Sequence, residues 1–319
     1  MNEVWEKFLN SAIFSDVKNN RLAHTILLVG EDSFAVEKFC SNLVLSIMCD
    51  AENKPCLTCP SCKKVLHNNN VDVAYYPKES KQMSVKEIED FITCVFMAPY
   101  EADRHVFVLK DANQIDKNTQ NKLLKILEEP PAGTYIILLA SEEYNILPTI
   151  KSRARIVRVP QMEQNEIREV LLDAIPEKDV AQTALMYCDN NCSRALRFAT
   201  DENFLSLVRI VEDLCLNFRH SSNMLTYASK LYPYSSHFDD VLEIYLQLLG
   251  RTIHFIVEKN SDEIGETIAR SHSIQALIEI TKQCGVLQEK FKRNCNGNSL
   301  VDSFLFMILE VRHKWPVMV

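Results

Sequence analysis

The sequence predicts an α/β domain built on a parallel sheet, followed by a region made of helices. The first part is indicated by short apolar runs that alternate with amphipathic stretches through residue 160. The second is indicated by apolar residues that recur at helical spacing from residue 163 onward. Only six glycines and eleven prolines occur among 319 residues, which favours long helices with few sharp turns.

The strands of the α/β domain are expected where an apolar run lacks helical periodicity and is bounded by turn residues. These runs cover residues 25–30, 71–76, 105–109, 135–140 and 155–159. Amphipathic stretches between them predict helices over residues 34–48, 85–97 and 117–128. Pro130 and Pro131 must end the third helix, because proline removes a backbone donor and restricts the residue before it.

The helical region predicts two further domains. Residues 163–200 have the pattern of three short helices, with breaks near Pro176 and Asn190, and would form a small lid. Longer helical patterns follow at residues 204–216, 238–258 and 299–313. We therefore expect three domains, at residues 1–160, 161–203 and 204–319, a number that suits a chain of this length.

Charge and hydropathy exclude several classes of protein. The net charge of −8 opposes strong nonspecific DNA binding by the isolated chain, because phosphate contacts need a local excess of Lys and Arg. No apolar run is long enough to cross a bilayer, and MNEVWEKFLN at the start lacks the basic and apolar regions of a secretory signal. The expected location is the cytoplasm, with no membrane partner.

Four of the eleven cysteines lie close together, in the pattern C-x6-C-x2-C-x2-C. Cys49, Cys56, Cys59 and Cys62 are expected to converge on one ion, and four thiolates suit tetrahedral zinc. Because protein fills all four positions, such a site is structural rather than catalytic. The other seven cysteines are scattered, and most are expected to be small buried hydrophobic residues.

The turn after the first expected strand is where a phosphate-binding loop would lie, but its chemistry is missing. Residues 30–37 read GEDSFAVE, against the pattern G-x-x-G-x-G-K-[ST]. Ser33 and Ala35 replace two glycines, while Val36 and Glu37 replace the lysine and the hydroxyl residue that hold phosphates and magnesium. Three carboxylates in the segment would also repel a triphosphate. We expect no ATP in this site.

The third expected strand has lost a second catalytic feature. It leads into Asp111 and Ala112, whereas an ATPase would follow that aspartate with a glutamate that orients the attacking water. Alanine cannot perform that role. Two separate elements of ATP hydrolysis are therefore absent together.

Two later motifs carry a specific resemblance. Residues 121–131, NKLLKILEEPP, resemble the N-x-L-L-K-x-L-E-E-P-P signature of bacterial clamp-loader subunits, the gamma/tau and delta-prime family. Residues 147–154, LPTIKSRA, are similar to the family's L-P-T-I-x-S-R-C, with Ala154 in place of cysteine. Arg21, His24, the four-cysteine insertion and the NGNSL element at residues 296–300 also match. Spacing from residue 30 to residue 49 equals that of ATP-binding members, so substitution rather than deletion removed the phosphate loop.

The resemblance implies an AAA+ α/β domain carrying a zinc module, a small helical lid and an all-α collar through which subunits oligomerise. It implies a place in the loader that puts the β sliding clamp on primer-template DNA, beside gamma/tau and delta subunits. Arg153 aligns with the family's arginine finger, which stabilises charge on the γ-phosphate in a neighbouring subunit. Arg194 lies where a lid sensor arginine would be, and without an ATP site we expect it to be structural. Ser152 is expected to shape the turn or a helix start.

Two other functions are compatible with parts of the sequence. An active gamma/tau-type ATPase is disfavoured by Val36, Glu37 and Ala112, and tight ATP binding would revive it. A zinc-ribbon protein that mainly binds DNA is disfavoured by the acidic balance and by the lack of interleaved aromatic and basic residues near the cysteines. Salt-sensitive DNA binding by the isolated chain would support that alternative.

Overall fold

Five short segments rich in Ile, Leu, Val and aromatic residues pair into one parallel sheet, as the alternating pattern predicts. The strands are β1 (Thr25–Val29), β2 (Val73–Tyr76), β3 (His105–Leu109), β4 (Thr134–Ala140) and β5 (Arg155–Arg158). Their order in the sheet is β2-β3-β4-β1-β5. Every strand falls within about two residues of its predicted ends, which confirms the predicted α/β fold class.

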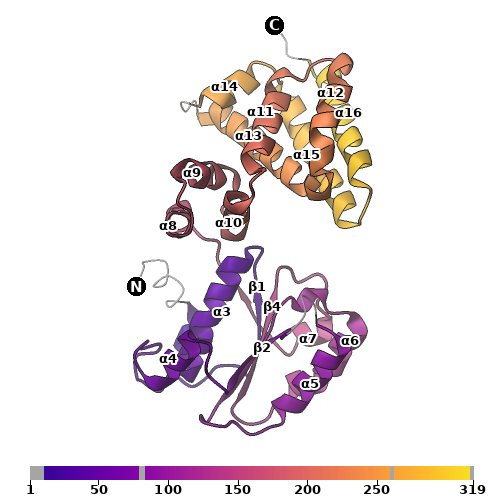
Figure 1. Ribbon diagram of the computed structural model, residues 1–319. Helices are drawn as coiled ribbons and strands as arrows, with labels where there is room; N and C mark the ends of the chain where they lie inside the picture. The colour runs from indigo at the N-terminus through magenta and orange to yellow at the C-terminus, as the bar shows by residue number, and fades with distance from the viewer. Residues whose placement is uncertain (1–10, 79–82, 259–261, 317–319) are drawn as a thin grey trace. The chain divides into compact units, whose positions relative to one another are not determined.

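The computed structural model in Figure 1 describes residues 11–78, 83–258 and 262–316. It divides into two compact units. The first contains the described residues up to Val170 together with Asn190–Arg194, and the second contains Leu171–Asp189 and the chain from Ala195 onward. The N-terminal residues 1–10, for which the sequence predicts no secretory signal, lie outside the described residues.

Helices cover both faces of the sheet, so β1 and β3 are buried along their whole length. One face is covered by α2 (Ala12–Lys18) and α3 (Ser33–Met48), and the other by α5 (Val85–Val95), α6 (Lys117–Glu128) and the short α7 (Pro148–Lys151) (Figure 1). Phe14 packs edge to face on Phe39 at 5.4 Å between ring centroids. On the opposite face, Phe91 packs in the same way on Phe107 at 5.6 Å.

The helix ends follow from local residues. Ser84 and Glu87 form a reciprocal capping box at the start of α5, which satisfies two otherwise unpaired backbone groups. Asp116 caps α6 by accepting from the amides of Asn118 and Thr119. That helix ends at Glu128, just before the two prolines that the sequence predicts to stop it.

From residue 164 onward, the described elements are helices and short 3-10 turns. The α-helices are α8 (Gln164–Ala174), α9 (Lys178–Tyr187), α10 (Cys192–Thr200), α11 (Phe204–Asn217), α12 (Met224–Leu231), α13 (Phe238–Glu258), α14 (Glu263–Ala269), α15 (Ile274–Lys292) and α16 (Gly297–Lys314). The core of the second unit runs from Ala184 to Val311, with Tyr245 and Phe304 fully buried at its centre. Within the described residues, none of these helices has the length and apolar character needed to span a bilayer.

Five of the seven scattered cysteines are buried, as expected of small hydrophobic residues. They are Cys40, Cys188, Cys192, Cys215 and Cys284. Cys94 is half-buried and Cys295 is exposed.

Candidate functional site

The carboxyl ends of β1, β3 and β4 meet at one edge of the sheet, where α/β proteins place their ligands. A cavity of about 50 Å³ lies there. Its lining consists of Gly30, Ser33, Val36, Glu37, Lys110, Asp111, Leu139, Ala140 and Ser141. Ligand pockets usually measure roughly 300 to 1,000 Å³, so this cavity is smaller than a typical ligand pocket.

Val36 fills the position where a phosphate-binding lysine would be. Its side chain is only 3% exposed and packs directly on the glycine that ends β1. A Cβ added to Gly30 would lie 2.8 Å from Val36 Cγ2 and 3.4 Å from Val159 Cβ. The one glycine that remains from the phosphate-loop pattern therefore allows close packing here, not an approach to phosphate.

Glu37, at the position of the magnesium-binding hydroxyl, is part of an ion pair. Its Oε1 atom lies 2.7 Å from Nζ of Lys110, the residue that follows β3. Both side chains are partly exposed, so the pair contributes little to stability. The lysine nevertheless compensates the negative charge of Glu37 at this end of the cavity. The repulsion of a triphosphate that the sequence predicts from Glu37 is therefore weaker than that of an unpaired carboxylate.

Asp32 is also internally paired and is only 5% exposed. Its Oδ1 atom accepts from the Phe34 amide at 3.1 Å, which caps α3. The same carboxylate accepts from the Cys192 amide at 2.7 Å, the Ser193 amide at 3.1 Å and Ser193 Oγ at 2.6 Å. All these residues belong to the first unit. These donors weaken the repulsion of a triphosphate that the sequence predicts from Asp32.

In the turn after β3, alanine stands at the position where an ATPase would have a glutamate that orients the attacking water. Asp111 adopts a left-handed backbone conformation with φ of 50°, and the following Ala112 is buried. Asn113 then exchanges two hydrogen bonds with Ser141, at 2.9 and 3.2 Å, and ties this turn to the end of β4.

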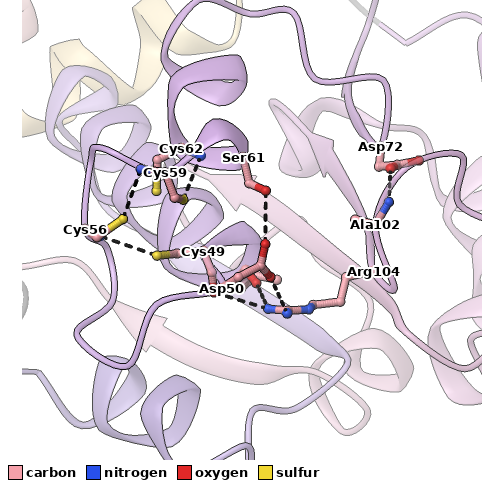
Figure 2. A network of polar contacts seen from close by, with 10 residues as sticks. Cys49, Asp50, Cys56, Cys59, Ser61, Cys62, Asp72, Ala102 and Arg104 are labelled. Atoms are coloured by element: carbon pink, nitrogen blue, oxygen red, sulfur yellow. Dashed lines mark hydrogen bonds and ion pairs between the residues drawn. The ribbon is translucent and has the colours of Figure 1, made fainter.

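The structure brings together the four cysteines that the sequence predicts as metal ligands (Figure 2). Cys49 closes α3, and Cys59 caps α4 (Pro60–Leu66), in which Cys62 lies. Cys56 lies in the intervening loop, and all four Sγ atoms lie within 4.8 Å of one another. This cluster can hold a metal ion.

The donor set fits tetrahedral zinc in distance and in charge. Zn–S bonds of about 2.3 Å place sulfur atoms about 3.8 Å apart, so only a small contraction is needed. Backbone amides of Cys56, Cys59 and Cys62 donate to the Sγ atoms of Cys49, Cys56 and Cys59 at 3.3 to 3.4 Å. Such donors stabilise thiolates. Burial raises the pKa of Cys49 and of Cys62, whereas backbone donors lower that of Cys56 to about 6. A bound cation would keep the buried thiols ionised.

Arg104 connects the cysteine module to the loop before β3 (Figure 2). Its guanidinium donates to the carbonyl oxygen of Ile47 and, at 2.9 Å, to Oδ1 of Asp50. The other Asp50 oxygen accepts from Ser61 Oγ at 3.2 Å. One arginine thus ties the end of α3 and the start of α4 to the sheet domain.

Asp72 orders the loop that leads into β3. Its buried carboxylate accepts from the amides of Tyr100, Glu101 and Ala102 at 2.5 to 2.9 Å, and His105 Nε2 lies 3.4 Å away. Burial alone would raise the pKa of Asp72, but the three amides and His105 hold it below its usual value. The sequence has no signal for this residue, because its donors lie about 30 positions away.

Arg153 lies at the surface, just after α7. Its Nη1 atom donates to the Thr149 carbonyl at 3.1 Å, and its Nη2 atom lies 3.0 Å from Oε1 of Glu128. The side chains are 32% and 55% exposed. Ser152 is the C-cap of α7 and lies in the turn that follows, so of its two expected positions the structure shows the turn and not the helix start. Arg194 lies in the first turn of α10, where its amide donates to Asn191 Oδ1 at 2.9 Å.

Known proteins share the sequence pattern over much of this chain. A family model described as DNA polymerase III, delta subunit, matches residues 5–163. DNA polymerase III subunit delta′ of Bacillus subtilis is 21% identical over 324 residues, covering 97% of this chain and 98% of that protein. The delta′ subunit of Haemophilus influenzae is 30% identical over 135 residues, covering 42% and 41%.

Subunits with other names match as well. DNA polymerase III subunit tau of Salmonella typhimurium is 23% identical over 180 residues, covering 56% of this chain and 28% of that protein. Among solved structures, a gamma subunit-related protein of Thermotoga maritima aligns over 95% of this chain and 100% of its own, at 17% identity and a TM-score of 0.43. That structural similarity is too low to inform function.

Proposed function

Because this chain belongs to the bacterial DNA polymerase III clamp-loader family of gamma/tau and delta-prime subunits, we propose that it is a delta-prime-like subunit without an ATPase site of its own. In this role it helps to load the β sliding clamp on primed DNA during replication. Hydrolysis then takes place in a neighbouring gamma/tau subunit. The relatives include both delta′ and tau subunits, so the residues of the phosphate-loop region carry the distinction.

The observation that carries the proposal is the filled edge of the sheet. Val36 is buried where a lysine would reach the phosphates, and Glu37 is paired with Lys110 where magnesium would be held. The remaining cavity of about 50 Å³ is smaller than a typical ligand pocket, which supports the proposal. A single substitution would not reverse this, because the lysine and the hydroxyl residue of the phosphate-loop pattern are both replaced.

The proposed contribution to catalysis is Arg153, acting on the neighbour's ATP. An arginine finger must be able to leave its resting partner, and the ion pair with Glu128 is exposed enough to break at little cost. A γ-phosphate carries more charge than a carboxylate and accepts from the guanidinium in the same bidentate way. The arginine follows the short helix α7 directly, so its backbone position is well defined.

We further propose that the four cysteines bind zinc in a structural role. All four ligand positions come from protein, so no open position is left for a reacting water. The ion would hold the end of α3 and the start of α4 together. Arg104 then transmits this order to the sheet domain.

The remaining parts of the proposal concern domains, partners and location. Residues 1–160 would form the AAA+ domain, residues 161–203 a lid and residues 204–319 a collar that binds gamma/tau and delta subunits. Contact with the clamp and with primer-template DNA would occur within that assembly, in the cytoplasm. The acidic net charge supports contact through partners rather than by the isolated chain.

Nucleotide binding by the purified chain tests the missing ATPase site. Isothermal titration with ATP and magnesium should show no binding at millimolar nucleotide. Micromolar binding would instead favour an active gamma/tau-type ATPase. Strong DNA binding by the isolated chain that weakens steeply with salt would favour the zinc-ribbon alternative.

The role of Arg153 requires a reconstituted loader with gamma/tau and delta subunits. Arg153→Ala should lower DNA-stimulated ATP hydrolysis at least about a hundredfold, since arginine fingers supplied in trans contribute factors of about 10³ to 10⁵. Arg158→Ala is the matched control, because Arg158 is a nearby exposed arginine paired with Glu143 at 2.7 Å. Equal activity of the two variants would refute the proposed finger.

A further inference from the structure

Two helices begin at the same carboxylate. The first helical amides of α3 and of α10 have no partner within their own helices, and in nucleotide-binding proteins such amides hold phosphate. Here the Phe34 amide of α3 and the Cys192 and Ser193 amides of α10 all donate to Asp32. The side chain of Asp32 thus occupies the centre of an anion-binding arrangement built from two segments 160 residues apart.

Asp32 accepts more hydrogen bonds, and from more distant residues, than an ordinary helix cap does. A capping aspartate accepts from the first turn of its own helix, as Asp32 does from Phe34. Three more donors come from the distant segment, namely the Cys192 amide, the Ser193 amide and Ser193 Oγ. Ser193 Oγ also accepts from the Phe34 amide at 2.7 Å and lies 2.9 Å from Ser33 Oγ. Most of the carboxylate's hydrogen bonds therefore join segments rather than cap one helix.

Charge and burial make the contact strong. Asp32 is 5% exposed, so water cannot readily replace its donors. Hydrogen bonds to a charged acceptor are about twice as strong as neutral ones. The positive ends of two helix dipoles further favour a negative charge at this position.

We propose that Asp32 is an internal substitute for a bound phosphate, which permanently holds residues 190–194 on the start of α3. In a chain that binds nucleotide at this position, the docking of that segment would depend on the nucleotide. Here the anion is the carboxylate of Asp32, which is part of the chain itself. Residues 190–194 therefore stay docked without any bound ligand. This inference goes beyond the absence of ATP, because it assigns a positive function to a residue of the altered loop.

Amide hydrogen exchange on the full chain tests the proposal directly. In Asp32→Ala, exchange at the Cys192 and Ser193 amides should accelerate at least about tenfold, because each loses its charged acceptor. Glu31→Ala is the matched control, since Glu31 is the neighbouring exposed carboxylate. Amides of β4 report any global unfolding and should stay protected in both variants. Unchanged exchange at Cys192 and Ser193 would overturn the proposal.

Two further variants separate charge from shape. Asp32→Asn keeps an acceptor oxygen but removes the charge, so its exchange should be much faster than that of the wild-type chain. Equal protection in Asp32→Asn and wild type would refute the role of the charge. If Asp32→Ala unfolds, Asp32→Ser gives the same information, because a serine hydroxyl can still cap α3 while the carboxylate that accepts from Cys192 and Ser193 is absent. Slow exchange at Cys192 in that variant would equally count against the proposal.

Small anions provide a final readout that does not involve ATP. In Asp32→Gly the carboxylate is removed and its space is left to solvent. Formate at tens of millimolar should restore protection of Cys192 and Ser193, whereas chloride at equal ionic strength should not. Formate should leave the wild-type chain unchanged, and rescue by chloride alone would contradict a specific anion position.

Discussion

Protonation of His272 is expected to destabilise the helical unit in mild acid. The ring is only 3% exposed, its Nδ1 atom donates to the Ile268 carbonyl at 3.2 Å, and its Nε2 atom accepts from Arg312 Nε at 2.9 Å. Both nitrogens are thus satisfied only in the neutral ring. Burial and the adjacent Arg312 guanidinium, with Arg219 nearby, lower the pKa of His272 to about 4.

The sign and size of the effect follow from linkage. The folded pKa of His272 lies below its unfolded value of about 6.5. The neutral ring therefore contributes its full stabilisation of the folded state above pH 6.5, and this stabilisation is lost as the pH drops toward 4. At about pH 5, protonation of the unfolded state shifts the unfolding equilibrium by a factor of roughly thirty, which amounts to about 2 kcal/mol of lost stability. The loss approaches roughly 3 kcal/mol at still lower pH.

Urea unfolding followed by Trp315 fluorescence measures this effect. Trp315 reports on the same region, because its carbonyl accepts from Ser273 Oγ at 3.0 Å. Trp5→Phe leaves Trp315 as the only tryptophan. In that background the free energy of unfolding should fall by about 2 kcal/mol more between about pH 7.5 and pH 5 in the native chain than in His272→Gln.

The comparison needs a control for other titrating groups. Glutamine keeps an acceptor for Arg312 but carries no titrating proton, so carboxylate effects cancel in the difference. His254→Gln removes an exposed histidine, 67% accessible on α13, and should behave like the native chain. The same pH dependence in His272→Gln and in the native chain would refute the reasoning.

Three further measurements test other contacts. Cys56→Ser should abolish stoichiometric zinc binding, because only three thiolates remain, whereas Cys94→Ser should retain it. Equal metal content of the two variants, measured by emission spectrometry, would contradict the four-cysteine site. Gly30→Ala should lower the free energy of unfolding by roughly 1 to 3 kcal/mol through overpacking, and adding Val36→Ala should recover most of it. Strict additivity of those two changes would exclude their contact. Asp72→Asn should lower the free energy of unfolding by roughly 2 to 4 kcal/mol, because three backbone amides lose a charged acceptor. A decrease below about 0.5 kcal/mol, measured by thermal or urea unfolding, would count against that network.

The sequence alone was sufficient for features that depend on local pattern. Strands such as β3 and helices such as α6 were predicted with the bounds they have, because apolar periodicity and the Pro130-Pro131 stop act within a few residues. The cysteine cluster was equally predictable, since its four cysteines lie within 14 residues and their spacing restricts their geometry. The loss of phosphate-binding side chains at Val36 and Glu37 needed no structure either.

The tertiary structure decided what replaces the lost phosphate chemistry. Glu37 and Lys110 are 73 residues apart, and Asp32 is 160 residues from Cys192, so no sequence window contains both partners. The parallel sheet brings the ends of β1 and β3 to one edge, and the beginning of α10 reaches the beginning of α3 within the first unit. Local residues therefore determine which side chains of the phosphate-loop pattern are replaced, whereas charge pairs between residues far apart in the sequence form only when the chain packs.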